Sequence, residues 1–242
     1  MAESAATHTG GAYVTGAAAG IGESIVDVLL EQGNAVTGAD LTRPAERDSG
    51  AFLPRALDIT SPSAHRELAA EAAEHGGGHL RTVVTHAFIG SATPLRELTV
   101  ADWNALIDVN LRGAMLTLQS SLPHLAEGGS MVITSSIAGR RYSSVMGPHY
   151  TVARYGLIGL GRHLAAELAG TGVRVNVVCP GPPDTPQMWE VTTEEQRQAI
   201  AASIPTRRLV APRDVAETVA FLASDDARHM HGAVVDVNGG LA

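Results

Sequence analysis

The sequence predicts an α/β fold in which a doubly wound parallel sheet of seven strands is covered by helices on both faces. Short runs of apolar and β-branched residues recur along the chain, and most lack the polar alternation of a half-exposed strand. Longer segments with a helical spacing of apolar residues separate these runs. Continuously apolar strands that alternate with helices indicate a parallel sheet buried on both sides, as in doubly wound folds.

The predicted elements follow one another in regular order. Strands are expected at residues 11–15, 35–40, 52–57, 82–85, 131–135, 173–179 and 234–237, of which 52–57 has the weakest pattern. Helices are expected at residues 22–32, 63–75, 101–125, 149–169 and 212–223. Because no shift in composition marks a second domain, we expect one domain over residues 1–242. An amphipathic insert at 190–204 belongs to a predicted substrate lid around 186–206.

The composition argues against several classes of protein. The 242 residues carry 17 basic and 25 acidic side chains, a net charge of −8, whereas a nucleic-acid-binding protein normally presents a basic face. The single cysteine, Cys179, excludes an internal disulfide and a cysteine-rich zinc site, and we expect no metal. No run of 18 apolar residues exists, and residues 1–10 lack the features of a secretory signal. We therefore expect a cytoplasmic protein without nucleic-acid or membrane partners.

A glycine-rich turn follows the first predicted strand. Residues 15–22 read Thr-Gly-Ala-Ala-Ala-Gly-Ile-Gly and lead into a helix. Glycines at such a turn let the backbone approach a pyrophosphate, and the helix N-terminus offers free N–H groups and the positive end of its dipole. The position between a strand and an amphipathic helix favours a Rossmann-type dinucleotide site over a tight turn without a ligand.

Two carboxylates follow the next strands. Asp40 ends the second strand, 18 residues after Gly22, where it can accept hydrogen bonds from the adenosine ribose and repel a 2′-phosphate. Because residues 15–22 contain no basic side chain, NAD is favoured over NADP. Asp58 ends the third strand and is expected either to accept a hydrogen bond from the adenine amino group or to cap a helix.

Six features in order resemble the short-chain dehydrogenase/reductase family over nearly the whole chain. They are the glycine turn, Asn110 in Asn-x-x-Gly, Ser136 after the fifth strand, Tyr150 14 residues later, the Pro-Gly-x-x-x-Thr segment 180–185 and the closing Asn238-Gly239-Gly240. The resemblance implies an NAD(H)-dependent oxidoreductase that interconverts a secondary alcohol and a ketone, or a similar carbonyl, in a small and largely apolar substrate.

The resemblance also implies roles for individual residues. Tyr150 would act as general acid or base on the substrate oxygen, Ser136 would hydrogen-bond the same oxygen, and Asn110 would hold a water of a proton relay. Hydride transfer changes the charge on one oxygen, and a positioned donor stabilises that charge. Thr185 would contact the nicotinamide carboxamide. The residues implied to bind the cofactor are Gly16, Ala19, Gly20, Ile21, Gly22, Asp40, Leu41, Asp58, Ile59, Ala87, Tyr150, Arg154, Pro180, Gly181 and Thr185.

Two positions depart from the family pattern. The family's Tyr-x-x-x-Lys is Tyr150-Thr-Val-Ala-Arg154 here, in a chain without any Lys. The spacing keeps both side chains on one helical face, and Arg keeps the positive charge, but its planar group is larger and cannot deprotonate. The family's Asn-Asn-Ala-Gly is Thr-His86-Ala87-Phe88. Phe88 must point away from the cofactor or crowd it, and His86 is expected to be a buried, hydrogen-bonded structural residue.

Two alternatives stay open. Ser136, Tyr150 and Arg154 also resemble the halohydrin dehalogenases, which have a similar fold and bind halide instead of nicotinamide. Those enzymes replace Gly20 by an aromatic residue, however, and have no use for Asp40 or for residues 180–185. The second alternative is a protein that binds the cofactor with little catalysis.

The substrate cleft and the oligomer are inferred only in outline. Residues 145–149 and 186–204 are expected to line the cleft, with apolar side chains from Tyr142, Met146, Met188 and Trp189. The resemblance implies a homotetramer or homodimer assembled through the helices predicted at 101–125 and 149–169. The small residues that would permit close helix contact are Ala153, Gly156, Gly159 and Ala166.

Overall fold

Seven parallel strands form one sheet, as predicted, and the structure shows their order to be β3-β2-β1-β4-β5-β6-β7. The computed structural model describes residues 10–241, so nearly all of the segment expected to lack a secretory signal lies outside the described residues. The strands are β1 (Gly11–Thr15), β2 (Ala35–Asp40), β3 (Phe52–Ala56), β4 (Leu80–Thr85), β5 (Leu125–Thr134), β6 (Arg174–Pro180) and β7 (Val234–Val237).

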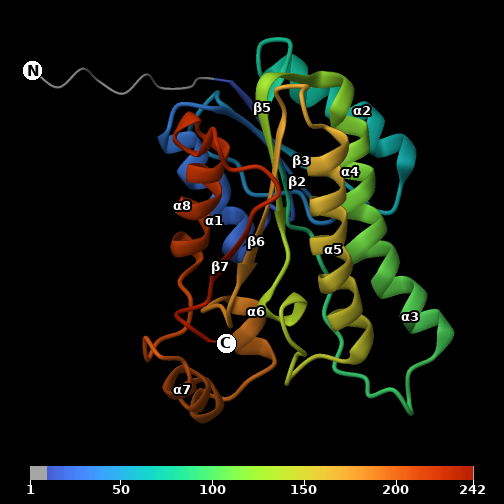
Figure 1. Cartoon of the computed structure of the whole chain (residues 1–242), viewed down its shortest axis with the longest axis vertical. Helices are drawn as coiled ribbons and strands as arrows, with labels where there is room; N and C mark the ends of the chain where they lie inside the picture. Colours follow the sequence, from blue (N-terminus) through green and yellow to red (C-terminus); the bar gives the residue numbers. More distant parts are fainter. Residues whose placement is uncertain (1–9, 242) are drawn as a thin grey trace, which may run out of the picture.

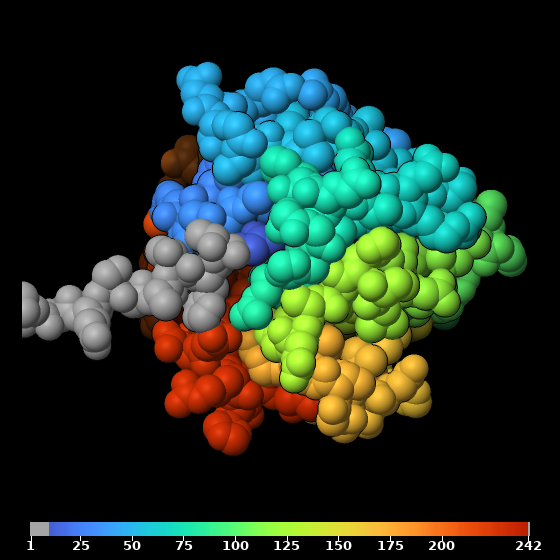
Figure 2. All heavy atoms as spheres, turned by 90° about the horizontal axis from the view of Figure 1, so that it is seen from above, coloured from blue at the N-terminus to red at the C-terminus, as the bar shows by residue number. Residues whose placement is uncertain are grey.

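Two layers of helices cover the sheet. In Figure 1, α1 (Gly20–Glu31) and α8 (Pro212–Ala223) pack together on one face, and α2 (Pro62–His75), α4 (Gly113–Ser121) and α5 (Pro148–Glu167) cover the other. The strand order places the early part of the chain at one edge of the sheet and the late part at the other. Figure 2 shows this arrangement, with the early blue and cyan segments opposite the late orange and red segments.

The strands are buried because they are apolar on both faces. Neighbouring residues of one strand enter different hydrophobic clusters: Val84 packs on the α1 and α8 side, and Val83 packs on the α2, α4 and α5 side. The same division holds in β5, where Val132 lies on the first side and Ile133 on the second. This two-sided burial explains why the sequence lacks polar alternation in its strands.

The helix predicted at 101–125 is interrupted. It consists of α3 (Val100–Ile107), a π-helical turn η1 (Asp108–Arg112), α4 and a short 3₁₀ turn η2 (Leu122–His124), and Leu125 already begins β5. A π-turn inside a helix is frequently found at functional sites. The prediction of one continuous helix was wrong because the apolar pattern alone does not show that the turn widens around Asn110.

The carboxyl ends of the strands meet at one edge of the sheet, which lies at the bottom of Figure 1 together with α6 (Pro186–Glu190) and α7 (Glu194–Ser203). The short 3₁₀ turns η3 (Ile137–Gly139) and η4 (Asp225–Ala227) complete the described elements. From β1 the chain proceeds outward to β2 and β3, and then returns to β4 on the other side of β1. The ends of β1 and β4 therefore form a topological switch point, where open α/β sheets bind their ligands. Among the described helices, none has the length and apolar character needed to cross a membrane.

Candidate active site

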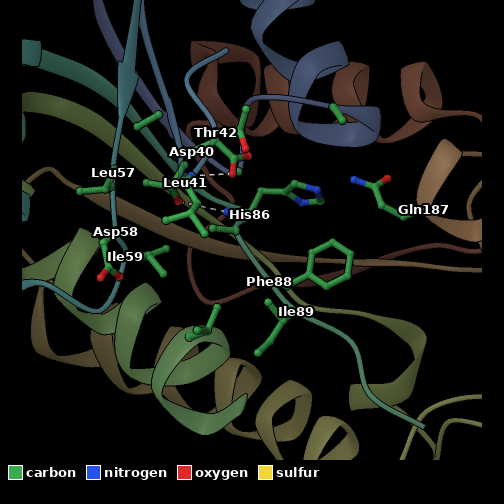
Figure 3. Close-up of a pocket in the computed structure, with 16 residues that line it drawn as sticks. Asp40, Leu41, Thr42, Leu57, Asp58, Ile59, His86, Phe88, Ile89 and Gln187 are labelled. Atoms are coloured by element: carbon green, nitrogen blue, oxygen red, sulfur yellow. Dashed lines mark hydrogen bonds between the residues drawn. The ribbon is translucent and has the colours of Figure 1, made fainter. Parts of the chain in front are cut away.

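A pocket of about 300 Å³ opens at this switch point. Its wall comes from the ends of β1, β2, β3 and β4, from η1 and from the start of α6 (Figure 3). The lining residues are Thr15, Gly16, Ala19, Ala39, Asp40, Leu41, Thr42, Leu57, Asp58, Ile59, His86, Ala87, Phe88, Ile89, Val109 and Gln187. Seven residues that the sequence assigned to the cofactor are thus brought together: Gly16, Ala19, Asp40, Leu41, Asp58, Ile59 and Ala87.

The turn after β1 has the geometry of a phosphate cradle. Gly16 has a φ of +77°, and a Cβ at this position would lie 2.5 Å from the backbone nitrogen of Ala87. A Cβ on Gly22 would lie 1.8 Å from the carbonyl oxygen of Gly16. Gly20 has a φ of +60° and faces Thr185 and Gln187. No side chain caps the N-terminus of α1, whereas α2, α3 and α7 are capped by Ser61, Thr99 and Thr193. The first N–H groups of α1 therefore remain available to an anionic ligand.

Asp40 is fixed at the rim of the pocket by backbone donors. Its Oδ1 accepts a hydrogen bond from the N–H of Leu41 at 2.7 Å, and its Oδ2 accepts one from the N–H of Ala18 at 3.1 Å. These bonds tie the end of β2 to the glycine turn and point the carboxylate along the pocket wall (Figure 3). Each oxygen keeps a second lone pair for an additional donor.

Asp58 lies at the other end of the same pocket. Its Oδ1 accepts hydrogen bonds from the backbone N–H and the hydroxyl of Thr60, and these bonds hold the pKa of the carboxyl below its usual range. Helix α2 is capped by Ser61, whose hydroxyl accepts from the N–H of Ala64. The helix-capping alternative for Asp58 was therefore wrong, because Asp58 organises the turn that precedes the cap.

Asn110 is buried in the π-turn, and its side chain bonds to the segment after β4. Its Nδ2 donates to the carbonyl of Ile89 at 2.9 Å, and its Oδ1 accepts from the N–H of Ile89 at 3.0 Å. The π-turn places the amide so that it pairs with one backbone residue through both atoms. Asn110 therefore fixes the segment that carries His86 and Phe88 into the pocket.

Ser136 and Tyr150 come from neighbouring segments after β5. Ser136 begins η3, where its Oγ accepts from the N–H of Ala138 at 3.1 Å, and Tyr150 lies in the first turn of α5 with 9% of its surface exposed. The two segments are joined because the hydroxyl of Ser135 donates to the carbonyl of Arg154 at 2.8 Å. Tyr150 packs in a small cluster with Leu106, Ala138 and Ala153.

Arg154 lies one helical turn after Tyr150 and is almost entirely buried, at 3% exposure. Its guanidinium carbon is 4.7 Å from the ring centroid of Tyr150 and 4.9 Å from that of Phe88. Its Nη1 donates to the carbonyl of Thr134 at 3.1 Å. Phe88 therefore points toward Arg154, and its ring lines the pocket.

His86 is buried as expected, at 8% exposure, but it is not fully hydrogen-bonded. Its Nδ1 has no partner among the described residues, and its ring meets Phe88 edge to face with centroids 5.7 Å apart. Burial, together with the charge of Arg154, lowers the pKa of His86 to about 3. The imidazole is therefore neutral at physiological pH.

The segment 180–185 begins with the last residue of β6 and packs beside the glycine turn. The N–H of Gly181 donates to the carbonyl of Val237, and the hydroxyl of Thr185 accepts from the N–H of Met188 to cap α6. The pocket wall contains none of the other eight residues assigned to the cofactor, namely Gly20, Ile21, Gly22, Tyr150, Arg154, Pro180, Gly181 and Thr185. The pocket thus gathers Asp40 and Asp58, which were assigned to adenosine, whereas Thr185, which was assigned to the nicotinamide carboxamide, is not part of its wall.

The predicted apolar cleft wall is only partly assembled. Met146 packs near Tyr150 and beside Gly90, whereas Tyr142 is 75% exposed and Trp189 is half exposed. The indole nitrogen of Trp189 donates to Asp184, which attaches α6 to the segment after β6.

Several pocket residues were not found from the sequence. Thr42, Ile89, Val109 and Gln187 line the pocket but belong to no motif. Two of them could have been found from their neighbours in the sequence. Val109 precedes Asn110, and Ile89 follows Phe88, and both of these neighbours were singled out. Gln187 reaches this pocket from α6, whereas the sequence placed it, within 186–204, in the expected lining of the substrate cleft.

Comparisons with known proteins agree with this geometry. A family model described as enoyl-(acyl carrier protein) reductase matches residues 16–242. The cis-4-hydroxycyclohexanecarboxylate dehydrogenase of Sinomonas cyclohexanicum is 38% identical, with 95% of each chain covered. The 3-oxoacyl-[acyl-carrier-protein] reductase of Thermotoga maritima is 32% identical, over 94% of this chain and 96% of the relative.

Solved structures give the same result. The ligand-free aldohexose dehydrogenase of Thermoplasma acidophilum superposes with a TM-score of 0.90 at 26% identity, covering 97% of this chain and 94% of the other. A short-chain dehydrogenase/reductase from Brucella melitensis superposes with a TM-score of 0.86 at 29% identity, covering 96% and 95% of the two chains. The motifs, the switch-point pocket and these relatives lead to one conclusion: the chain belongs to the short-chain dehydrogenase/reductase family, whose dehydrogenases use NAD(P), and it is an oxidoreductase acting on CH–OH groups.

Proposed function

We propose that this oxidoreductase uses NAD(H) to interconvert a secondary alcohol and a ketone, or a similar carbonyl, in a small and largely apolar substrate. The observation that carries the cofactor preference is Asp40, whose carboxylate is held at the pocket rim by two backbone donors. None of the described residues that line the pocket is Arg, and the chain has no Lys. A 2′-phosphate at this rim would meet the negative charge of Asp40, and no basic side chain among the pocket-lining residues would compensate it.

The residues present fit a dinucleotide. The uncapped N-terminus of α1 and the glycines at 16, 20 and 22 would hold the diphosphate, because a side chain at any of them would be strained or would collide with a neighbour. Asp40 would hold the adenosine ribose, and Asp58 with Ile59 would hold the adenine. Pro180, Gly181 and Thr185 would lie on the nicotinamide side. The bound cofactor would supply or accept a hydride.

The chain's own contribution to the chemistry is a proton and a positioned hydrogen bond. In this proposal the Tyr150 hydroxyl gives a proton to the substrate oxygen during reduction and removes it during oxidation. Ser136 donates a hydrogen bond to the same oxygen. Tyr150 is buried and Ser136 is half-buried, and a hydrogen bond to a developing charge is stronger in such a setting than in water. Asn110 supports them by fixing the segment after β4.

The substrate and the assembly are also proposals. Apolar side chains are exposed around the site at Ile89, Val145 and Trp189, which suits a largely apolar substrate. Val152 and Tyr155 are half exposed on α5, and this favours a homodimer or homotetramer that uses α4 and α5. The net charge of −8 speaks against a nucleic-acid partner.

The test is to measure binding of NADH and NADPH to the purified protein by fluorescence or calorimetry. We expect tighter NADH binding, and Asp40→Asn should reduce the preference for NADH over NADPH by roughly tenfold, because it removes one unit of repulsion at a partly exposed site. Asp48→Asn, an exposed carboxylate in the loop after β2, is the matched control and should leave the preference unchanged. If neither dinucleotide binds, the proposal fails, and halide binding should be tested next. If NADPH binds more tightly, the role of Asp40 fails.

A further inference from the structure

Phe88, Arg154 and Tyr150 form one contact cluster, which we call the guanidinium cluster. The guanidinium carbon lies over both rings, 4.9 Å from the centroid of Phe88 and 4.7 Å from that of Tyr150. Tyr150 and Arg154 share a face of α5, whereas Phe88 reaches them from the segment after β4. The two positions at which the sequence departs from its family therefore touch each other.

The buried charge of Arg154 has little polar compensation. Only Nη1 donates a hydrogen bond, to the carbonyl of Thr134, and Nε has no partner among the described residues. Within residues 10–241, Arg154 also makes no ion pair. A buried cation is costly unless other groups compensate it, and the face of an aromatic ring attracts a desolvated guanidinium. The rings of Phe88 and Tyr150 therefore take the place of a counter-ion.

Phe88 forms the pocket wall in front of Arg154. Phe88 is 37% exposed and lines the pocket, where Figure 3 shows its ring beside His86. Arg154 is 3% exposed and does not line the pocket. With 3% of its surface exposed, Arg154 lies against the tyrosine ring and offers little of its guanidinium to a ligand.

We propose that Phe88 is a positioning residue that holds the guanidinium of Arg154 against Tyr150, so that Arg154 acts on the tyrosine and not as a ligand of the cofactor. This inference rests on the proposed function, because it assigns Arg154 a task in proton transfer by Tyr150. It also makes Phe88 and Arg154 a coupled pair: the arginine is accommodated because the phenylalanine is present, and each substitution alone disturbs the other residue.

The kinetic test compares Phe88→Leu with Phe88→Tyr. Leu keeps an apolar side chain at the pocket wall but removes the aromatic face, so we expect kcat to fall about tenfold while the Kd for NADH changes less than about threefold. Tyr keeps the ring, and its hydroxyl can point to solvent from this partly exposed position, so it should restore kcat close to wild type. Phe221→Leu, on the exposed surface of α8, is the matched control and should leave both constants unchanged.

Three kinetic results would overturn the proposal. One is an unchanged kcat in Phe88→Leu. Another is a loss of NADH affinity as large as the loss of kcat, which would place Arg154 or Phe88 on the cofactor. The third is equal damage by Leu and Tyr, because Tyr keeps the aromatic face that Leu removes.

A second measurement does not depend on activity. Urea unfolding of wild type, Phe88→Leu, Arg154→Lys and the double variant gives the coupling between the two residues. We expect the folding equilibrium constant of the double variant to differ about tenfold from the value that the two single variants predict together. Additive changes in the free energy of unfolding would contradict the contact of Arg154 with the Phe88 ring. If the wild type transfers no hydride with any alcohol or ketone, the proposed function fails, and this cycle still decides whether Phe88 holds Arg154.

Discussion

His86 should make the stability of this protein depend on pH in a way that one substitution removes. Its imidazole is 8% exposed, its Nδ1 has no partner among the described residues, and the charge of Arg154 lies nearby. Burial is the larger cause and the arginine the smaller cause of a pKa lowered to about 3. The folded protein therefore resists protonation at this site.

The size of the effect follows from proton linkage. In the unfolded chain a histidine has a pKa near 6.5, so the unfolded state binds the proton first as the pH falls. The stabilising contribution of His86 is complete above about pH 6.5 and is lost progressively as the pH falls toward the folded value of about 3. A pH of about 4.5 lies about two units below the pKa of the unfolded-state histidine. At about 1.36 kcal/mol per unit, the free energy of unfolding therefore falls by about 2.7 kcal/mol between neutral pH and about pH 4.5.

The assay is urea unfolding of wild type and His86→Asn at about pH 7.5 and pH 4.5. Asn does not titrate, so the difference in unfolding free energy between wild type and variant should shift by about 2–3 kcal/mol, in favour of the variant, at the lower pH. Val84→Ala, a buried and non-titrating change in the strand that precedes His86, should lower stability equally at both values. Parallel pH dependence of wild type and His86→Asn would refute the reasoning.

Three further predictions concern the site and the core. Tyr150→Phe should lower kcat by about 10²–10⁴-fold and leave NADH binding intact, because it removes only the proton donor, and a fully active variant in steady-state assays would contradict the role of Tyr150. Arg174→Met should reduce the free energy of unfolding by about 2–4 kcal/mol, because the buried guanidinium donates to carbonyls at the end of α8, including those of Leu222 and Ser224. An unchanged urea midpoint would contradict this. Burial raises the pKa of the Cys179 thiol to about 11, so a thiol reagent at about pH 8 should label it only after unfolding, and rapid labelling of the native protein would be the opposite result.

Much of the candidate site was predictable because its signals are local. The glycine turn at residues 15–22 must approach its own strand and helix, and the structure shows that side chains at Gly16 and Gly22 would collide with backbone atoms. Asp40 was predictable because the end of β2 follows from the apolar run before it. Such features depend on contacts between residues that are close in the chain or in adjacent elements.

Other features depended on contacts that no local pattern contains. The π-turn at Asn110 occurs where its amide pairs with Ile89, a residue 21 positions away in the chain. The use of Asp58 was ambiguous for the same reason, since only the structure shows that Ser61 caps α2 and Asp58 binds Thr60.

The sequence alone determined the doubly wound sheet, the phosphate turn and the family, because strand burial, helix periodicity and glycine spacing are encoded in runs of neighbouring residues. Only the tertiary structure decided what the departures at positions 86, 88 and 154 mean. His86 and Phe88 follow β4, and Arg154 lies on α5, so their contact exists only when the sheet brings these elements together. The energy of a buried charge depends on what surrounds it in space, and the order of residues along the chain does not contain that information.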